Sequence, residues 1–436
     1  MRVSVARSRR GDGVEAARGE LVVDGIEAER GRFAALFAEL RRDPAAFSDP
    51  TAIAVGAAMS AAKLARGFRE HFHTTPPAAL EAARVVRAEE LLARGEAGDD
   101  AASAAGFADL ETFRERCRRT TGLAPEAFRQ LGRKPEFVLA LPRDFLPGPT
   151  LRSWGRDPAS LTERVDGHRI LRTLRSEQAG AALVEIEIAD GLARCRVEAE
   201  RPIDPSTVRA AHRVARRTLG LVDGHGGAVD VGVFERRVLR DPSTARLVAK
   251  RRGLRIPLTA DPFEALTWAV LGQQVNLAFA FTLRRNLLAL VGLPAPRGMR
   301  AHATADEIAR LDPADLVRRQ LSRSKAQYLV ELSRAVAGGE LPLDTLRGAA
   351  AARIEETLLA RRGVGPWTAA YVMLRGFGLA DCVPVGDAGL ALALERYHDL
   401  DERPDAARTR QLMAPFAPHR SLATFHFWNS LGDSPP

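Results

Sequence analysis

The chain of 436 residues has only three cysteines, and no two of them form a CxxC pair: Cys117, Cys195 and Cys382. Cysteines so far apart cannot build a disulfide framework, a four-cysteine zinc site or a four-iron cluster. We therefore expect a reducing, cytoplasmic compartment and no metal site. We also expect no organic cofactor. Residues 1–30 are polar and rich in glycine and arginine, without the apolar segment of a secretory signal, so we interpret them as a flexible tail.

Long apolar runs are also missing. The most apolar stretch, residues 266–283, is interrupted by Gly272, Gln273, Gln274 and Asn276. A bilayer penalises such amides, so the stretch predicts soluble helices and no contact with a membrane. Lysine is scarce as well, with four lysines among 64 basic residues, which outnumber 55 acidic ones. This balance favours an anionic partner, most commonly nucleic acid, although an arginine-rich genome produces the same excess.

From about residue 31 to 132 the chain is helical and repeats itself loosely after 49 residues. The matched positions are Leu64, Phe68, Arg69 and Pro76, then Phe113, Cys117, Arg118 and Pro125. Each unit has a short helix, a tight turn and a second helix with apolar positions four apart and basic residues between them. Helices paired in this way suit insertion into successive major grooves. The alternative is an ordinary helical bundle with solvated arginines.

Two segments, SAAKLARGFREHF and DLETFRERCRRTTGLAPEAF, resemble the AraC-type tandem helix-turn-helix domain. This resemblance implies recognition helices near residues 60–72 and 109–119. One departure is His73, because the first unit would usually have glycine in that turn. The resemblance implies that the basic side chains of these helices contact DNA: Lys63, Arg66, Arg69, Arg114 and Arg118.

A proline-rich segment near residues 135–158 precedes a region whose pattern is typical of strands rather than helices. Between Val184 and Ala199 apolar and polar residues alternate on both sides of Asp190-Gly191, which predicts a β-hairpin with one buried face. Asp204 and Pro205 then predict the capped start of a helix that runs to about Leu219. Residues 136–250 are therefore expected to form a small α+β domain.

Residues 251–436 are predicted to be helical. Asp261 precedes Glu264 with the spacing of a capping box, and further helices are expected near Thr304, Pro313 and Ser324. The most informative segment is RRGVGPWTAAYVMLRG, residues 361–376. It predicts a helix, a hairpin and a second helix that opens with proline; the hairpin residues are Gly363, Val364 and Gly365. Such a hairpin directs free backbone amides at a phosphate without reading sequence.

Twenty residues after Trp367 stands Asp387, at the start of another predicted helix. An isolated aspartate there is ordinarily a cap. The spacing from hairpin to Asp387 resembles the helix-hairpin-helix glycosylase superfamily, which implies that Asp387 is the essential carboxylate. Capping and catalysis can be combined, because each needs only one carboxylate oxygen.

A closer resemblance is to the AlkA family of 3-methyladenine DNA glycosylases, over roughly residue 136 to the C-terminus. It rests on DPFEALTWAVLGQQVNLA, GVGPWTAAYVMLRG and APHRSLATFHFW together. It implies a TBP-like α+β domain followed by an all-α glycosylase domain. It also implies flipping of a damaged base into a pocket lined by Trp367, Tyr371 and Trp428. The loop with Gln273 and Gln274 would enter the gap that the base leaves.

The expected protein is mostly α, with a tandem helix-turn-helix domain at 31–132, an α+β domain at 136–250 and a glycosylase domain at 251–436. By this resemblance it is a monofunctional, monomeric bacterial enzyme associated with the nucleoid. It would excise alkylated purines from double-stranded DNA and could also regulate transcription. The alternative is a transcription factor whose glycosylase-like half senses damage without catalysis. Core packing explains each pocket ring equally well when that ring is taken alone.

Overall fold

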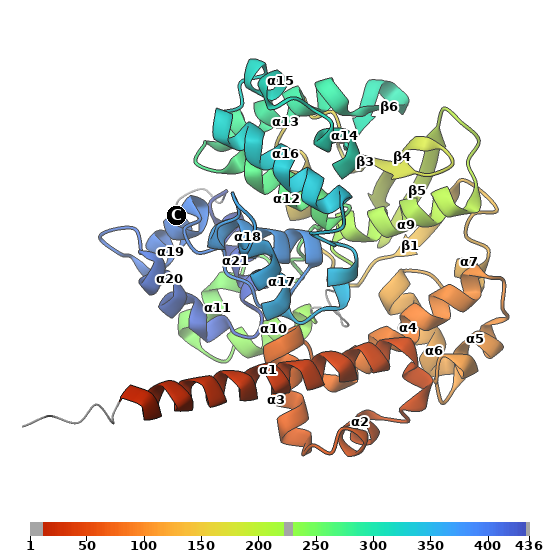
Figure 1. Cartoon of the computed structure of the whole chain (residues 1–436). Coiled ribbons are helices and arrows are strands. Elements are labelled where there is room, and N and C mark those ends of the chain that lie inside the picture. Colours follow the sequence, from red (N-terminus) through yellow and green to blue (C-terminus); the bar gives the residue numbers. More distant parts are fainter. Residues whose placement is uncertain (1–11, 222–229, 433–436) are drawn as a thin grey trace, which may run out of the picture.

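The computed structural model describes residues 12–221 and 230–432, arranged as Figure 1 shows. The N-terminal region consists of α1 (Asp12–Arg42), η1 (Pro44–Ala46), α2 (Pro50–Gly56), α3 (Ala61–Phe72), α4 (Pro76–Ala93), α5 (Gly98–Ala104), α6 (Leu110–Thr121) and α7 (Pro125–Arg129). Ser60 caps α3 and Asp109 caps α6, because each side chain accepts a hydrogen bond from the amide three residues on. Helices are therefore present at both positions that the sequence predicted.

The tail expected at residues 1–30 is helical over most of its length. Residues 1–11 lie outside the described residues, but α1 covers residues 12–30, so the expectation of a flexible tail is wrong there. Farther along α1, Phe33 and Phe37 are buried against α3. This packing anchors the helix, and the alanine and glutamate content of its sequence favours extension toward the N-terminus.

The middle region contains a five-stranded antiparallel sheet with the strand order β1-β5-β4-β3-β2. Its strands are β1 (Glu136–Ala140), β2 (Glu163–Asp166), β3 (Arg169–Ser176), β4 (Gly180–Ala189) and β5 (Leu192–Ala199). Asp190 and Gly191 both have positive φ, as a two-residue turn between β4 and β5 requires, so the predicted hairpin is confirmed. Helix α8 (Pro147–Trp154) joins β1 to β2. Helix α9 (Pro205–Leu219), capped by Asp204, packs on β3 and β4.

The second helix-turn-helix unit and the sheet share one apolar core. Cys117 of α6, Leu139 of β1 and Val208 of α9 are all buried in it. His212 of α9 donates a hydrogen bond through Nε2 to the carbonyl oxygen of Thr121 over 2.8 Å. The segment between α7 and β1 thus marks a change of secondary structure, whereas the core continues across it.

The remaining elements are predominantly helical: α10 (Val231–Val238), α11 (Pro242–Val248), α12 (Pro262–Gly272), α13 (Leu277–Val291), β6 (Leu293–Ala295), η2 (Pro296–Gly298), β7 (Met299–Ala301), α14 (Ala305–Ala309), α15 (Pro313–Arg318), α16 (Arg323–Ala337), η3 (Thr345–Gly348), α17 (Ala351–Leu359), α18 (Pro366–Val372), η4 (Met373–Phe377), α19 (Ala388–His398), α20 (Ala406–Met413), η5 (Ala414–Phe416) and α21 (Arg420–Ser430). One apolar cluster joins α12–α18, and a second joins α10, α11 and α19–α21. Trp428 packs against both clusters, so it marks their boundary.

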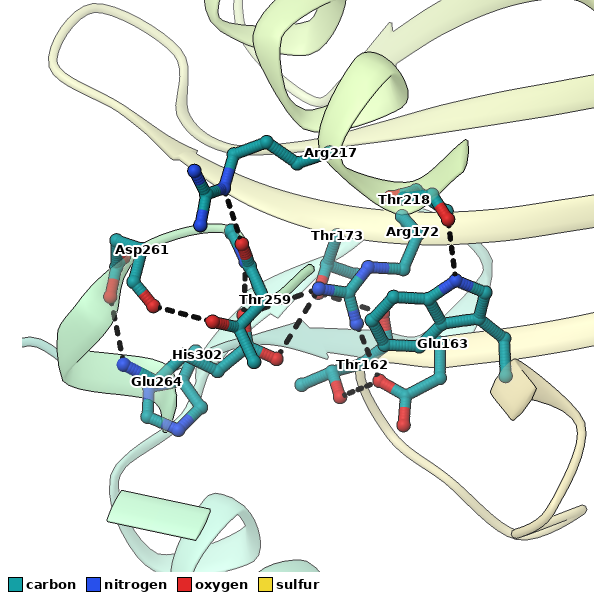
Figure 2. Close-up of polar contacts among 12 residues, drawn as sticks. Thr162, Glu163, Arg172, Thr173, Arg217, Thr218, Thr259, Asp261, Glu264 and His302 are labelled. Atoms are coloured by element: carbon teal, nitrogen blue, oxygen red, sulfur yellow. Dashed lines mark hydrogen bonds and ion pairs between the residues drawn. The ribbon is translucent and has the colours of Figure 1, made fainter. Parts of the chain in front are cut away.

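A buried ion network joins the sheet to α12 and α13. Figure 2 shows its part around Arg172, Glu163 and Glu264. Arg172 of β3 lies 2.8 Å from Glu163 and 3.2 Å from Glu264, and Arg284 of α13 contacts the same two carboxylates. Burial opposes ionisation of Glu264, but the two arginines outweigh it and lower its pKa to about 2. Asp261 caps α12 as expected, whereas the carboxylate of Glu264 serves this network rather than completing a capping box.

The helices, the cysteines and the candidate metal ligands were each compared with what the sequence predicted. Among the described residues, no helix has both the length and the apolar character needed to cross a membrane. The three cysteines are buried and free, and burial raises the pKa of each thiol. Within the described ranges, no group of three or more His, Cys, Asp and Glu side chains is arranged to hold a metal ion.

Candidate active site

The hairpin between α17 and α18 has the backbone that its glycines allow. Gly363 has a φ of +86°, and a Cβ atom there would lie 2.4 Å from the ring of Tyr328, so a larger residue would clash. Val364 is buried in the core, as expected for the apical residue of this turn. Gly365 begins α18 without a side-chain cap, and no atom lies within 4 Å of its missing Cβ. The first amides of α18 are therefore open to an approaching backbone phosphate.

The loop after α12 is tied to this hairpin. The side-chain amide of Gln273 donates to the carbonyl oxygen of Gly363 over 2.8 Å and to Oγ1 of Thr368 over 3.0 Å. Gln274 is exposed and has a φ of +52°, a left-handed conformation that non-glycine residues adopt at a cost. The two glutamines thus differ: Gln273 fixes the loop against the hairpin, and Gln274 projects from it.

Asp387 is held by three N–H donors. Its Oδ1 accepts hydrogen bonds from the amide of Leu390 over 2.7 Å and from Nε1 of Trp428 over 2.8 Å. Its Oδ2 accepts one from Nε1 of Trp367 over 3.0 Å. Asp387 therefore caps α19, as the sequence predicted, and the two indoles fix the plane of its carboxylate.

The three expected pocket aromatics meet around this carboxylate. The ring centroids of Trp367 and Tyr371 are 5.6 Å apart, and those of Tyr371 and Trp428 are 6.3 Å apart. Tyr371 is buried, and burial raises its pKa. The two tryptophans are only partly buried, so their rings extend from the core to the surface beside Asp387.

The basic residues expected to contact DNA lie on the second helices of the two N-terminal units. Arg66 and Arg69 of α3 and Arg118 of α6 are exposed. The partly exposed Lys63 forms a 3.1 Å ion pair with Glu29 of α1, and the exposed Arg114 pairs with Glu126 over 3.7 Å. Exposed ion pairs are weak, so a phosphate can replace either carboxylate.

Sequence reasoning missed two parts of the site. The tryptophans were expected to present ring faces, and their role as hydrogen-bond donors to Asp387 was not foreseen. It also missed the pair of Asp381 and Arg420, whose guanidinium binds the carboxylate through Nε at 2.7 Å and a second nitrogen at 2.6 Å. The only local signal was an aspartate six residues before Asp387, because its partner is 39 residues away in the sequence.

Comparison with protein families identifies both halves of the chain. Residues 53–131 match the helix-turn-helix domain, and residues 267–418 match the HhH-GPD superfamily of base excision DNA repair proteins. The DNA-3-methyladenine glycosylase of Bacillus subtilis is 32% identical over 205 residues, which are 46% of this chain and 68% of the relative. The chain belongs to the DNA-3-methyladenine glycosylase family.

The name of a second relative combines a DNA repair function with a transcriptional one. This relative is the probable bifunctional transcriptional activator/DNA repair enzyme AlkA of Mycobacterium tuberculosis, 30% identical over 287 residues. These residues are 65% of this chain and 49% of that protein. The AraC-type helix-turn-helix domain expected from the sequence is thus confirmed beside the glycosylase.

Solved structures confirm the expected fold class. The 3-methyladenine DNA-glycosylase of Archaeoglobus fulgidus superposes with a TM-score of 0.58 at 19% identity, over 68% of this chain and 98% of that one. An 8-oxoguanine glycosylase/lyase of Clostridium acetobutylicum in complex with double-stranded DNA has a TM-score of 0.53 at 17% identity, over 68% and 96%. The protein is a DNA glycosylase of base excision repair with a DNA-binding helix-turn-helix domain.

Proposed function

We propose that this glycosylase hydrolyses the N-glycosidic bond of alkylated purines, of the 3-methyladenine and 7-methylguanine type, after flipping them out of double-stranded DNA. The observation that carries the proposal is the Asp387 carboxylate, which two indole N–H groups hold beside aromatic rings. Aromatic faces attract electron-poor, cationic rings such as N-alkylated purines. The name of the B. subtilis relative includes 3-methyladenine, which favours this class of substrate.

The chemistry follows from the charge of the substrate. An N-alkylated purine is a cation, so it leaves as a neutral base without a general acid. Breakage of the bond leaves an oxocarbenium-like sugar, which a fixed carboxylate stabilises. Asp387 fits this role, and it can also orient the water that attacks the sugar. Because Trp367 and Trp428 fix the carboxylate before the reaction, little reorganisation is needed in the transition state.

The same proposal makes the enzyme monofunctional. Glycosylases that also cut the strand use a lysine near the hairpin to form a Schiff base. No lysine follows Lys325 in the sequence, and the position twenty residues before Asp387 is Trp367. Lys325 itself is buried, and its Nζ donates to the carbonyl oxygen of Leu271 over 2.8 Å. Water is then the nucleophile.

DNA contacts are proposed at two surfaces. The glycosylase surface consists of the hairpin Gly363–Gly365 and the adjoining Gln273–Gln274 loop, of which Gln274 enters the gap. The helix-turn-helix surface contains the basic side chains of α3 and α6: Lys63, Arg66, Arg69, Arg114 and Arg118. We infer a monomer divided at 31–132, 136–250 and 251–436, in which the first two regions share a core.

Regulation of transcription is a second candidate function, favoured by the helix-turn-helix match and by the named activator function of the M. tuberculosis relative. Selective binding to promoter DNA of repair genes, compared with unrelated DNA of the same length, would support it. Equal affinity for both DNAs would contradict it.

The glycosylase proposal is tested on duplexes that each carry one defined lesion. We expect wild-type protein to release 3-methyladenine and 7-methylguanine and to leave undamaged purines in place. Asp387→Asn preserves size and capping while it removes the charge, so it should bind the duplexes and release no base. Release at the wild-type rate by Asp387→Asn would refute the assignment.

A further inference from the structure

His73 ends α3 in a conformation that favours glycine. Its φ is +54°, in the left-handed region, where residues other than glycine are strained. The equivalent residue of the second unit, 49 positions on, is Gly122, which ends α6 with a φ of +75°. A histidine in this strained conformation is explained if its side chain makes a contact that glycine cannot make.

That contact reaches the glycosylase half of the molecule. Nδ1 of His73 accepts a hydrogen bond from the backbone N–H of Asp381 over 3.2 Å. The histidine is neutral in this role, and burial lowers its pKa to about 4. Around it, α3 packs against α17, Ala350 lies in the apolar cluster of the first unit, and Arg30 pairs with Glu356. The first unit is thus docked on the glycosylase.

Asp381 begins a loop whose two ends are both tied to α21. At one end, the carboxylate of Asp381 accepts hydrogen bonds from the backbone N–H and the guanidinium of Arg420, the first residue of α21. At the other end, Asp387 accepts one from Trp428 of the same helix. Only five residues lie between the two aspartates, so the position of Asp381 determines where the backbone approaches Asp387.

We propose that His73 is a positioning residue through which the docked helix-turn-helix unit holds the 381–387 loop, and thereby Asp387, in the geometry needed for excision. The proposal rests on the catalytic role of Asp387 given above. It makes the N-terminal half part of the working enzyme as well as a DNA-binding module. It also accounts for the departure of His73 from the glycine usual in the turn.

The test is His73→Gly in the full chain. Glycine suits the left-handed conformation, as Gly122 does in the second unit, so α3 keeps its end. Relief of the backbone strain offsets the lost hydrogen bond, so the variant should unfold close to the wild-type temperature. Loss of one hydrogen bond should lower kcat for excision about threefold to tenfold, with KM for the lesion duplex nearly unchanged. A purely structural role would move stability or KM instead.

Two parallel variants separate the possible outcomes. Gln320→Gly replaces another left-handed residue, which has a φ of +74° and is exposed after α15, and should leave kcat unchanged. If Asp387→Asn is inactive and His73→Gly excises at the wild-type rate, this inference is overturned while the proposed function stands. If Asp387→Asn remains active, the proposed function fails and the inference fails with it.

Discussion

Nε1 of Trp367 lies 3.0 Å from Oδ2 of Asp387, while Nε1 of Trp428 binds the other oxygen. The two indoles come from α18 and α21, which are separated by more than forty residues of chain. The same rings contribute to the aromatic group around Tyr371. One pair of side chains therefore orients the carboxylate and lines the space beside it, which joins substrate recognition to catalysis at a single place.

The first prediction separates these two roles. Trp367→Phe keeps an aromatic face but removes the N–H that binds Oδ2 of Asp387. Hydrogen bonds to charged groups contribute about 1.5–3 kcal/mol, so single-turnover excision of 3-methyladenine should slow about 10- to 100-fold. Binding of the lesion duplex should change little. The control is Trp268→Phe, which alters a tryptophan packed on Phe281 in the same bundle. Equal rates for both variants would contradict a donor role of Trp367.

The second prediction concerns the nucleophile. Treatment of the enzyme and a lesion duplex with borohydride should trap no covalent adduct, because Lys325 is buried and its ammonium group is bound to a backbone carbonyl. Arginine stays protonated in proteins and cannot replace lysine in this chemistry. Strand breaks should appear only after alkali is added. A trapped adduct, or breaks before alkali, would refute attack by water.

The local features of the fold could be read from the sequence, because they depend on neighbours. Asp204, Asp261 and Asp387 were each expected to begin a helix, and each caps one. A cap bonds to amides two or three residues away, so residue type and spacing suffice to find it. The β4–β5 hairpin was predictable for the same reason, since its turn requires Asp190-Gly191.

Contacts between distant segments could not be read in this way. His73 was noticed only as a departure from glycine, because its partner Asp381 is 308 residues away. The indole donors of Asp387 and the core shared by α6 and the sheet were missed for the same reason. The tertiary fold determines which apolar faces pack together, and the pattern of a single sequence does not show which faces meet.

The third prediction tests the buried ion network. Glu264→Gln removes one negative charge between Arg172 and Arg284 and leaves positive charge uncompensated in the interior. Breaking such a buried pair costs about 3–5 kcal/mol of the free energy of unfolding, which urea titration at pH 7 measures. Glu340→Gln is the control, because Glu340 pairs with Arg361 at the surface and should cost under about 1 kcal/mol. Equal decreases in the free energy of unfolding for the two variants would contradict a larger contribution of the buried network to stability.

The fourth prediction concerns pH and His212, which is 1% exposed in the core shared by α9 and α6. Burial lowers its pKa from 6.5 to about 3, with a further contribution from Arg216. As pH falls below 6.5, this histidine binds a proton in the unfolded chain but not in the folded chain. The free energy of unfolding therefore falls by about 1.4 kcal/mol per pH unit until about pH 3.

The variant His212→Gln does not titrate at this position and can still donate to the carbonyl oxygen of Thr121. The free energy of unfolding should therefore drop less between pH 7 and pH 5 in this variant than in wild type, by about 2 kcal/mol. The exposed His168, changed to Gln in the same way, serves as the control and should preserve the wild-type slope. If His212→Gln and His168→Gln have the same slope, His212 is protonated in the folded protein and its neutral burial is refuted.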